Sequence, residues 1–477
     1  MQNRKLFQLL GTLSPNERRR FRKWLLSPIH NPNNTLSKFY NIIDSRSVWT
    51  ARSLNAQKIF ARLFAGKEYD DLVIRRLLSE LLEQLEQFLL YENWQHHPQE
   101  IALLRVRLYR SRQLPREASF HLKEAGATLD AQPQRDAQYY LYAYRLQEEL
   151  LLQAPTRGTA LNMQEMSDEL DAFFAAEMLR NACTALSHQA VYRADYRLPY
   201  LEAVLADCAA GRFDRAPVIR LYYLSYRCLT HPESEADFFD LKKLLPRAGH
   251  WLPQAELRNV LTFAINYCIR RLNTGGEHFF REVFDLYRMG LAQNAFLENG
   301  VFNRFTFKNI VAAALKLGEM DWTEDFIGRH ASQLPAVHHE AYERFTRAKV
   351  AYQRGDYDRV RTLLADLDID DVFLRLDARV MLLKVYFESG EWRLLRGFLV
   401  SFERFVSRKK MLPYQAPNYL NIIHLTQKIL HFDAQASAEE YDQLQQQIRT
   451  AQPLTERGWL LARLEERLRT VLPGSSV

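Results

Sequence analysis

Three similar turns in the C-terminal half of the chain decide the fold: residues 317–322 (LGEMDW), 354–358 (RGDYD) and 389–392 (SGEW). Each turn has a glycine, then an acid, then a large apolar residue, and the glycines are 37 and 35 residues apart. Glycine can end a helix in the left-handed conformation, and the acid favours the positive start of the next helix. The apolar side chain can then pack into the angle between the two. Because each turn lies between amphipathic segments, the spacing predicts helix–turn–helix repeats of the tetratricopeptide type.

Helical patterns continue outward from these turns. The segment 253–272 has two apolar stripes, which is typical of a helix packed between neighbours, and residues 211–214 (GRFD) resemble a weaker copy of the turn. Near the start of the chain, residues 14–17 (SPNE) form a capping box with proline at the first helical position. Further helices are predicted at 70–92, 98–112, 115–130, 134–153, 162–192 with an interruption, 198–210, 215–230, 234–245 and 253–272.

These patterns predict an all-α protein. We expect a tetratricopeptide-like solenoid of stacked helix pairs, wound as a right-handed superhelix with an N-terminal helical cap, because the apolar face of each pair must be covered by the next pair. Residues 154–158 (APTRG) are the best candidate for an internal linker, and residues 437–440 (SAEE) form a second capping box. Four regions follow: an N-terminal cap (1–95), an irregular array of helical hairpins (96–296), tetratricopeptide-like repeats (297–435) and C-terminal capping helices (436–477).

Composition supports a folded helical chain. Of the 477 residues, 47% are hydrophobic and 25% charged, and the low counts of 17 Gly and 17 Pro favour long helices with short turns. No apolar stretch is long enough to predict a membrane span, and the opening residues lack the apolar core of a secretion signal. The four cysteines form no metal-binding or redox motif, so we expect buried thiols in a cytoplasmic protein.

Candidate catalytic and metal sites each have a simpler interpretation, so the sequence predicts no enzyme, no cofactor and no metal. Asp366, Asp368, Asp370 and Asp371 lack the glycine and the glutamate of a calcium loop, and helix capping explains them better. The histidine pairs at 96–97 and 338–339 are neighbours, which point about 100° apart on a helix, and both lie close to predicted helix starts. Gly275 and Gly276 stand outside any phosphate-binding motif and are expected to end a helix.

Two groups of residues are candidates for partner binding. The net charge is +7, and residues 1–30 hold seven basic residues against one acid. Arg19, Arg22 and Lys23 lie on the polar face of the first capped helix, where they could contact phosphates, an acidic protein, or only solvent. Tyr139 and Tyr140 belong to a tyrosine-rich helix and could grip a peptide or fill gaps between helices.

Several segments resemble an uncharacterised family of long helical proteins found in the Bacteroidota, which is distantly similar to tetratricopeptide proteins. The resemblance is carried by residues 13–17, 21–28, 74–81, 266–273, 305–311, 377–379 and 402–405. It implies a helical-repeat fold and brings no activity. The leading hypothesis is therefore a non-enzymatic scaffold or adaptor that binds a protein partner. The alternative is a nucleic-acid-binding protein that uses the basic N-terminal helix, and the oligomeric state stays open.

Overall fold

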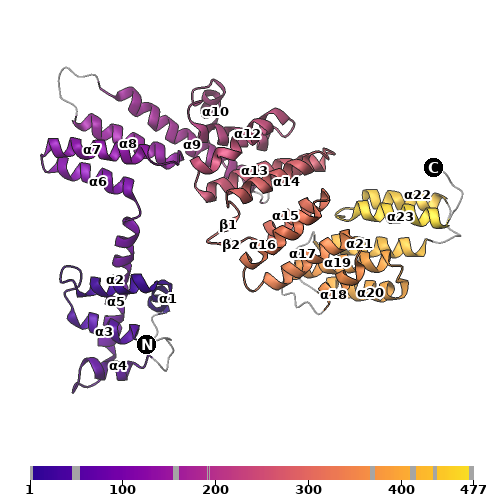
Figure 1. The fold of residues 1–477 in the computed structure, drawn as a ribbon, viewed down its shortest axis with the longest axis horizontal. Helices are drawn as coiled ribbons and strands as arrows, with labels where there is room; N and C mark the ends of the chain where they lie inside the picture. Colours follow the sequence, from indigo (N-terminus) through magenta and orange to yellow (C-terminus); the bar gives the residue numbers. More distant parts are fainter. Residues whose placement is uncertain are drawn as a thin grey trace. The chain divides into compact units, whose positions relative to one another are not determined.

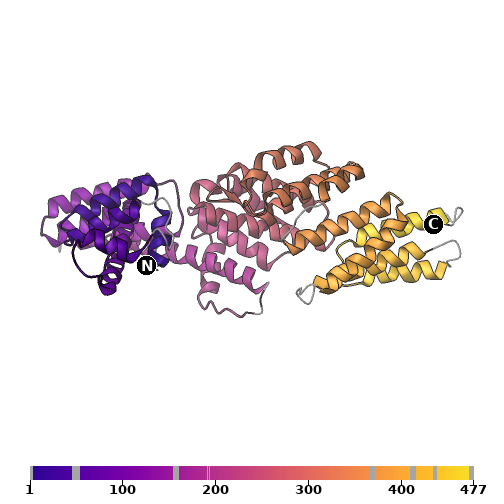
Figure 2. The same ribbon diagram turned by 90° about the horizontal axis from the view of Figure 1, so that it is seen from below.

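A computed structural model describes residues 4–45, 54–153, 161–190, 192, 194–365, 371–408, 415–432 and 438–471. These residues form α-helices, one short 3-10 helix and a single two-residue-per-strand hairpin, which confirms the all-α prediction (Figures 1 and 2). The chain divides into two compact units, Met1–Glu177 and Met178–Val477. Within the described residues, none of the helices combines the length and the apolar character that crossing a membrane requires.

The N-terminal unit consists of helices whose ends follow from local capping chemistry. Ser14 accepts a hydrogen bond from the backbone N–H of Glu17, and the Glu17 carboxylate accepts one from the Ser14 N–H at 2.7 Å, so the predicted capping box is confirmed. The helix that follows buries Phe21 and Leu25 in an apolar core. The helices are α1 (Arg4–Thr12), α2 (Pro15–Leu26), α3 (Asn34–Asp44), α4 (Ala56–Leu63), α5 (Asp71–Trp94), α6 (Pro98–Ser111), α7 (Pro115–Asp130), α8 (Ala137–Gln153) and α9 (Met163–Gln189), the last of which continues into the second unit.

The C-terminal unit is also helical, and successive helices pack against one another along the chain (Figure 1). Its elements are α10 (Leu201–Ala209), α11 (Pro217–Thr230), α12 (Glu235–Trp251), α13 (Gln254–Asn273), α14 (Phe279–Ala292), β1 (Leu297–Glu298), β2 (Val301–Phe302), α15 (Arg304–Lys316), α16 (Met320–His330), η1 (Ala331–Gln333), α17 (His339–Gln353), α18 (Tyr357–Leu364), α19 (Val372–Glu388), α20 (Trp392–Arg408), α21 (Gln415–His431), α22 (Ala438–Thr450) and α23 (Arg457–Val471). As predicted, α13 is buried on several faces, and all four cysteines are buried.

The three turns that decide the fold have the predicted geometry. Gly318, Gly355 and Gly390 have φ values of 76°, 74° and 68°, which lie in the left-handed region. After Gly355, the Asp356 carboxylate caps α18 by accepting a hydrogen bond from the Arg359 N–H at 3.0 Å. The apolar side chain also packs back as expected in the third turn, since Trp392 contacts Phe387 of the preceding helix edge to face at 5.3 Å.

One prediction about local structure is wrong, and one feature was not predicted. We expected an interruption within 162–192, but α9 is one continuous helix. Its buried residues recur every three or four positions from Ala172 through Leu179 to Cys183 and give it an unbroken packing face. The hairpin β1–β2 was not expected. Asn299 and Gly300 form its turn with φ values of 52° and 79°, as the tightest hairpin turns require.

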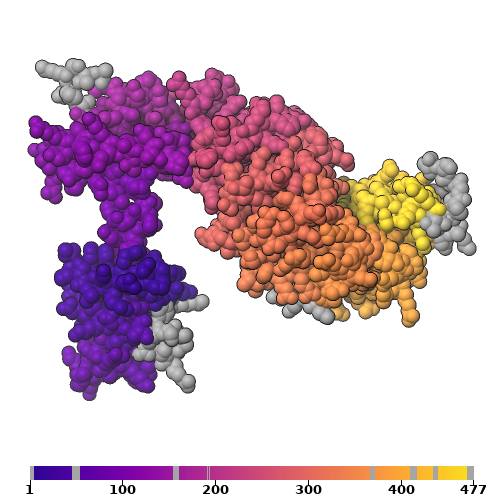
Figure 3. All heavy atoms as spheres, in the orientation of Figure 1, coloured from indigo at the N-terminus to yellow at the C-terminus, as the bar shows by residue number. Residues whose placement is uncertain are grey.

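Helices α15 to α19 pack together inside the C-terminal unit. Helix α15 contacts α17, and α17 contacts α19. In the sequence, α16 lies between α15 and α17, and α18 lies between α17 and α19. Residues from α19, α20, α21, α22 and α23 share one apolar core. Figure 3 shows side chains filling the spaces between the ribbons of Figure 1 on one face of the unit. The predicted linker 154–158, the capping residue Ser437 and three of the aspartates (Asp366, Asp368 and Asp370) lie outside the described residues.

Candidate functional site

A groove of about 450 Å³ lies among the helices of the C-terminal unit. Helices α15, α17 and α19 each contribute side chains, and α21 and the segment before α23 close one side. We call it the lysine groove and define it by the residues that carry its chemistry: Lys308, Ala312, Lys316, Lys349, Tyr352, Asp377, Lys384 and Glu456. Its four lysines face two carboxylates, so the lining carries a net charge of +2.

The lining of the groove follows the spacing of the three glycine turns. Ala312, Lys349 and Lys384 each precede the next turn glycine by six residues, and all three line the groove. Positions three residues before the glycine also recur in the lining, as Leu315 and Tyr352. Equivalent positions on equivalent helices face the same way, so one repeat after another presents its sixth residue to the same surface.

Two of the lysines are neutralised by carboxylates far away in the sequence. The Lys308 ammonium lies 2.7 Å from the Asp377 carboxylate, and the Lys384 ammonium lies 3.1 Å from the Glu456 carboxylate. Lys384 also lies over the ring of Tyr352, 4.9 Å from its centroid. These four side chains are between 18% and 32% exposed, so each ion pair is sheltered without being sealed from solvent.

Lys349 is different because it has no such partner. Among the described residues, no hydrogen bond or ion pair reaches its ammonium, which lies 5.5 Å from the centroid of the Phe345 ring. Burial lowers the pKa of Lys349, and the ammonium groups of Lys308 and Lys384 lower it further, against the opposing effect of Asp377 and Glu456. The groove therefore holds one partly buried cation whose charge nothing nearby satisfies directly, and such a cation favours the approach of an anion.

A carboxylate outside the lining holds the Tyr352 side chain in place. Glu388 accepts hydrogen bonds from the hydroxyls of Tyr352 and Tyr357, each at 2.7 Å, and from the indole of Trp459 at 2.6 Å. Burial raises the pKa of Tyr357 to about 12, with the bond to Glu388 adding to the effect. These contacts fix Tyr352 in the groove wall and tie α23 to the repeats.

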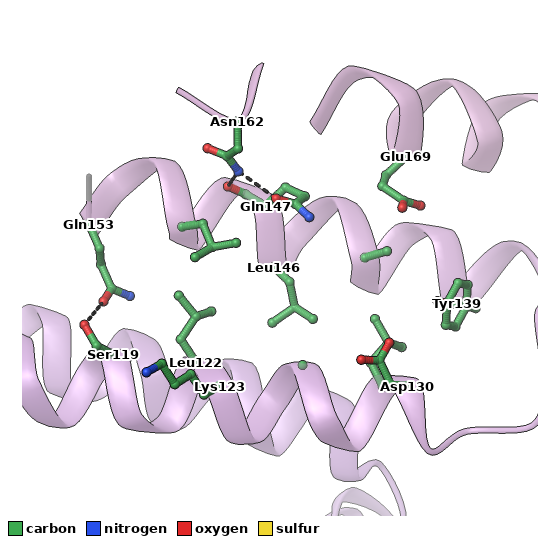
Figure 4. A pocket seen from close by; sticks show the side chains of 14 residues that line it. Ser119, Leu122, Lys123, Asp130, Tyr139, Leu146, Gln147, Gln153, Asn162 and Glu169 are labelled. Atoms are coloured by element: carbon green, nitrogen blue, oxygen red, sulfur yellow. Dashed lines mark hydrogen bonds between the residues drawn. The ribbon is translucent and has the colours of Figure 1, made fainter. Parts of the chain in front are cut away.

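A second cavity lies in the N-terminal unit. Figure 4 shows this pocket of about 670 Å³ between α7, α8 and the start of α9, with Leu122 and Leu146 on its floor. Its rim is tied together by hydrogen bonds from Ser119 to Gln153 at 3.0 Å and from Asn162 to the Gln147 side chain at 2.7 Å. Charges of both signs line it, as Lys123, Asp130 and Glu169, so its lining indicates no single class of ligand.

The two predicted tyrosines have different surroundings. Tyr139 lines this second cavity and lies under the guanidinium of Arg135, 4.2 Å from its ring centroid. Tyr140 is only 8% exposed, and burial raises its pKa, which places it in the packing between helices. The structure thus brings one of the pair to a cavity and buries the other.

The predicted basic cluster is partly neutralised. The Arg22 guanidinium lies 2.6 Å and that of Arg18 3.1 Å from the carboxylate of Asp44, and Arg20 pairs with Glu92. Arg19 and Lys23 are exposed on α2. The two acids come from α3 and α5 and together carry two negative charges, so packing of the helices removes part of the local excess of positive charge.

The other residues that the sequence analysis considered as metal or phosphate ligands lie at helix ends. Asp371 caps α19 by accepting from the backbone N–H of Phe373 at 2.9 Å, which confirms the capping interpretation for this aspartate. His338 and His339 lie at the start of α17 and His97 precedes α6, as predicted. Gly275 takes a φ of 95° just after α13 ends.

Sequence reasoning did not single out the lysine groove, although one signal was available. Aligning the three turns on their glycines would have placed Lys349 and Lys384 at one position and Ala312 at the same position of the first repeat. Its ion pairs had no such signal, because Lys308 and Asp377 are 69 residues apart and Lys384 and Glu456 72 apart. No family model and no curated protein matches the chain. The resemblance to the Bacteroidota family therefore stays a prediction.

Proposed function

We propose that the protein is a non-enzymatic, tetratricopeptide-like solenoid that holds an extended segment of a protein partner along the lysine groove. The observation that carries the proposal is the recurrence of one register position, Ala312, Lys349 and Lys384, in the lining of a single groove. A surface built from repeats offers the same kind of contact at regular intervals. An extended peptide has regularly spaced side chains and can make these contacts one after another.

The dimensions agree with this role. Packed helices lie about 8–10 Å apart, and an extended chain advances about 3.3 Å per residue. A bound segment would therefore pass from one groove helix to the next about every three residues. Ala312 and Gln353 are exposed in the lining and leave its middle accessible, while Tyr352 is held in place by Glu388.

Site-specific photo-crosslinking tests the proposal. A photoreactive amino acid replaces Ala312 or Gln353 inside the groove, or Leu394 on α20, which is 58% exposed and does not line the groove. The variants are irradiated in native lysate, and adducts are identified by mass spectrometry and then tested as purified proteins by titration calorimetry.

We expect a defined adduct from both groove positions and none of the same mass from Leu394. Filling the groove with A312W should abolish binding of the purified partner and leave the helical circular-dichroism spectrum unchanged. Equal adducts from all three positions, or binding that A312W does not affect, would rule out the groove as the binding surface.

A further inference from the structure

The charged side chains of the lysine groove form an incomplete set. Lys308 is paired with Asp377, Lys384 is paired with Glu456, and Lys349 is influenced by all four of these groups. The fourth lysine of the lining, Lys316, lies over the ring of Phe280, 5.3 Å from its centroid. The cluster around Lys349 therefore has three ammonium groups and two carboxylates, and Lys349 is the one of these three lysines that no carboxylate contacts.

The next repeat shows how a lysine at this position acquires a carboxylate partner. Lys384 occupies the same register position as Lys349, and its carboxylate comes from Glu456, which directly precedes α23. Glu456 belongs to the C-terminal helices, outside the repeat that it contacts. A lysine at this register position can therefore pair with a carboxylate that comes from outside its own repeat.

The first repeat leaves room for such a carboxylate. Its equivalent residue is Ala312, which is exposed and has no side chain beyond Cβ. Asn309, also exposed in the lining, offers an amide from the same helix. On α15, the position equivalent to Lys349 is therefore occupied by a small, uncharged residue. It neither blocks nor repels an acidic side chain that enters the groove from outside.

We propose, on the basis of the function proposed above, that the occupant is an acidic peptide segment that delivers an Asp or Glu side chain to Lys349. The carboxylate forms a charge-assisted hydrogen bond with the Lys349 ammonium and completes the set of pairs. Neighbouring residues of the segment rest on the apolar lining, which includes Phe345, Val380 and Met381.

The lining favours a peptide over a nucleic acid. A nucleic-acid strand carries a phosphate about every 3.4 Å, and Asp377 and Glu456 would repel several of them. A segment with separate carboxylates and apolar residues between them meets both the cation and the apolar wall. Because the groove continues over α15, α17 and α19, the segment passes through, and the carboxylate belongs to a side chain instead of the chain end.

Fluorescence anisotropy with the full chain tests the proposal. The probe is a fluorescein-labelled polyglutamate peptide with an amidated C-terminus, compared with polyglutamine of the same length, with the free-acid polyglutamate and with a single-stranded DNA oligonucleotide. We expect both polyglutamates to bind alike, with an affinity that falls as salt rises, and polyglutamine to bind much more weakly. K349M should weaken polyglutamate binding about 10- to 100-fold, as loss of a charge-assisted hydrogen bond predicts.

K243M is the matched control, because Lys243 lies in the same unit, pairs with Asp240 and does not line the groove. It should bind polyglutamate as the unaltered protein does. A second variant retains Lys349: A312E places a carboxylate beside the vacant position and should weaken polyglutamate binding, whereas A312Q should not.

Three results would overturn the proposal: K349M binding polyglutamate normally, polyglutamine binding as well as polyglutamate, or DNA binding more tightly with the same dependence on Lys349.

The experiments distinguish failure of the acidic-peptide proposal from failure of the groove as a binding surface. Adducts at Ala312 that excess polyglutamate does not suppress would refute the acidic ligand and leave the groove as the binding surface. Absence of any adduct would refute the groove itself.

Discussion

Lys349 shows most clearly how packing and charge oppose each other in this protein. The helical pattern of α17 places it between buried residues such as Ala348 and Val350, and the groove then surrounds its ammonium. Burial and the neighbouring ammonium groups of Lys308 and Lys384 disfavour the charged form of Lys349, which lowers its pKa. Residues that lower stability in this way are frequent at binding sites, where a ligand supplies the missing partner.

We therefore predict that K349M stabilises the protein at neutral pH, by about 1 kcal/mol. Because the pKa of Lys349 is lowered in the fold, the folded state loses this proton at a lower pH than the unfolded state does. The unaltered protein should thus become more stable as pH rises through the lowered pKa towards the ordinary lysine value, and the advantage of K349M should shrink.

Urea unfolding at a series of pH values measures this difference. The charged groups that face Lys349 are Lys308, Lys384, Asp377 and Glu456, and the comparison begins at neutral pH. K243M should match the unaltered protein throughout. A K349M protein that is less stable at neutral pH would show that the ammonium is satisfied in the fold.

The turn glycines allow a second prediction at the residue scale. Gly355 has a φ of 74°, and a Cβ there would meet no atom within 4 Å, so backbone strain alone opposes a side chain. The left-handed conformation costs a non-glycine residue about 1–2 kcal/mol, partly offset by the lower entropy of the unfolded chain. G355A should therefore destabilise the protein by about 1 kcal/mol.

Gly328 is the matched control, since it lies inside α16 with equal space around it and an ordinary helical backbone. G328A should be neutral or stabilising, by up to about 1 kcal/mol. Equal effects of the two substitutions in urea unfolding would contradict the strain argument.

At the scale of elements, Glu388 connects helices that are distant in the sequence. Its carboxylate, 11% exposed, accepts from Tyr352 of α17, Tyr357 of α18 and Trp459 of α23. The three donors would each lose a partner if the carboxylate were removed. The last helix is thus attached to the repeats by a polar contact as well as by the apolar core.

We predict that E388A loosens α23 first, at a cost of about 2–4 kcal/mol from the unpaired donors. Hydrogen exchange should accelerate in α23 and at the C-terminal end of α17, and remain unchanged in α11 and α13. E465A is the control on α23, because Glu465 forms an exposed ion pair with Arg469 of the same helix. This substitution should change the free energy of unfolding by less than about 0.5 kcal/mol. Unchanged exchange in α23 would show that its apolar contacts are sufficient.

At the scale of the whole molecule, the division into two compact units predicts two unfolding transitions. Leu81 and Leu383 are fully buried in separate apolar cores, one in each unit. Each Leu→Ala change should cost about 2–5 kcal/mol in its own core. In scanning calorimetry, L81A should lower one transition and L383A the other. A single transition that both substitutions shift equally would mean that the units unfold together.

The sequence by itself determined the helices and their turns, because these depend on neighbouring residues. The capping box at Ser14, the left-handed glycines at 318, 355 and 390 and the aspartate cap at 371 all satisfy backbone groups within a few positions. The same local reasoning failed at α9, where packing along an unbroken stripe of buried residues outweighed the expected interruption.

Only the tertiary structure decided which charges remain available. The basic cluster of α2 looked free in the sequence, yet Asp44 and Glu92 neutralise much of it. Lys308, Lys349 and Lys384 looked alike, yet two of them find carboxylates about 70 residues away. Coulomb interactions depend on distance in space, and the packing of distant helices sets that distance, so a local pattern cannot show which lysine is left without a partner.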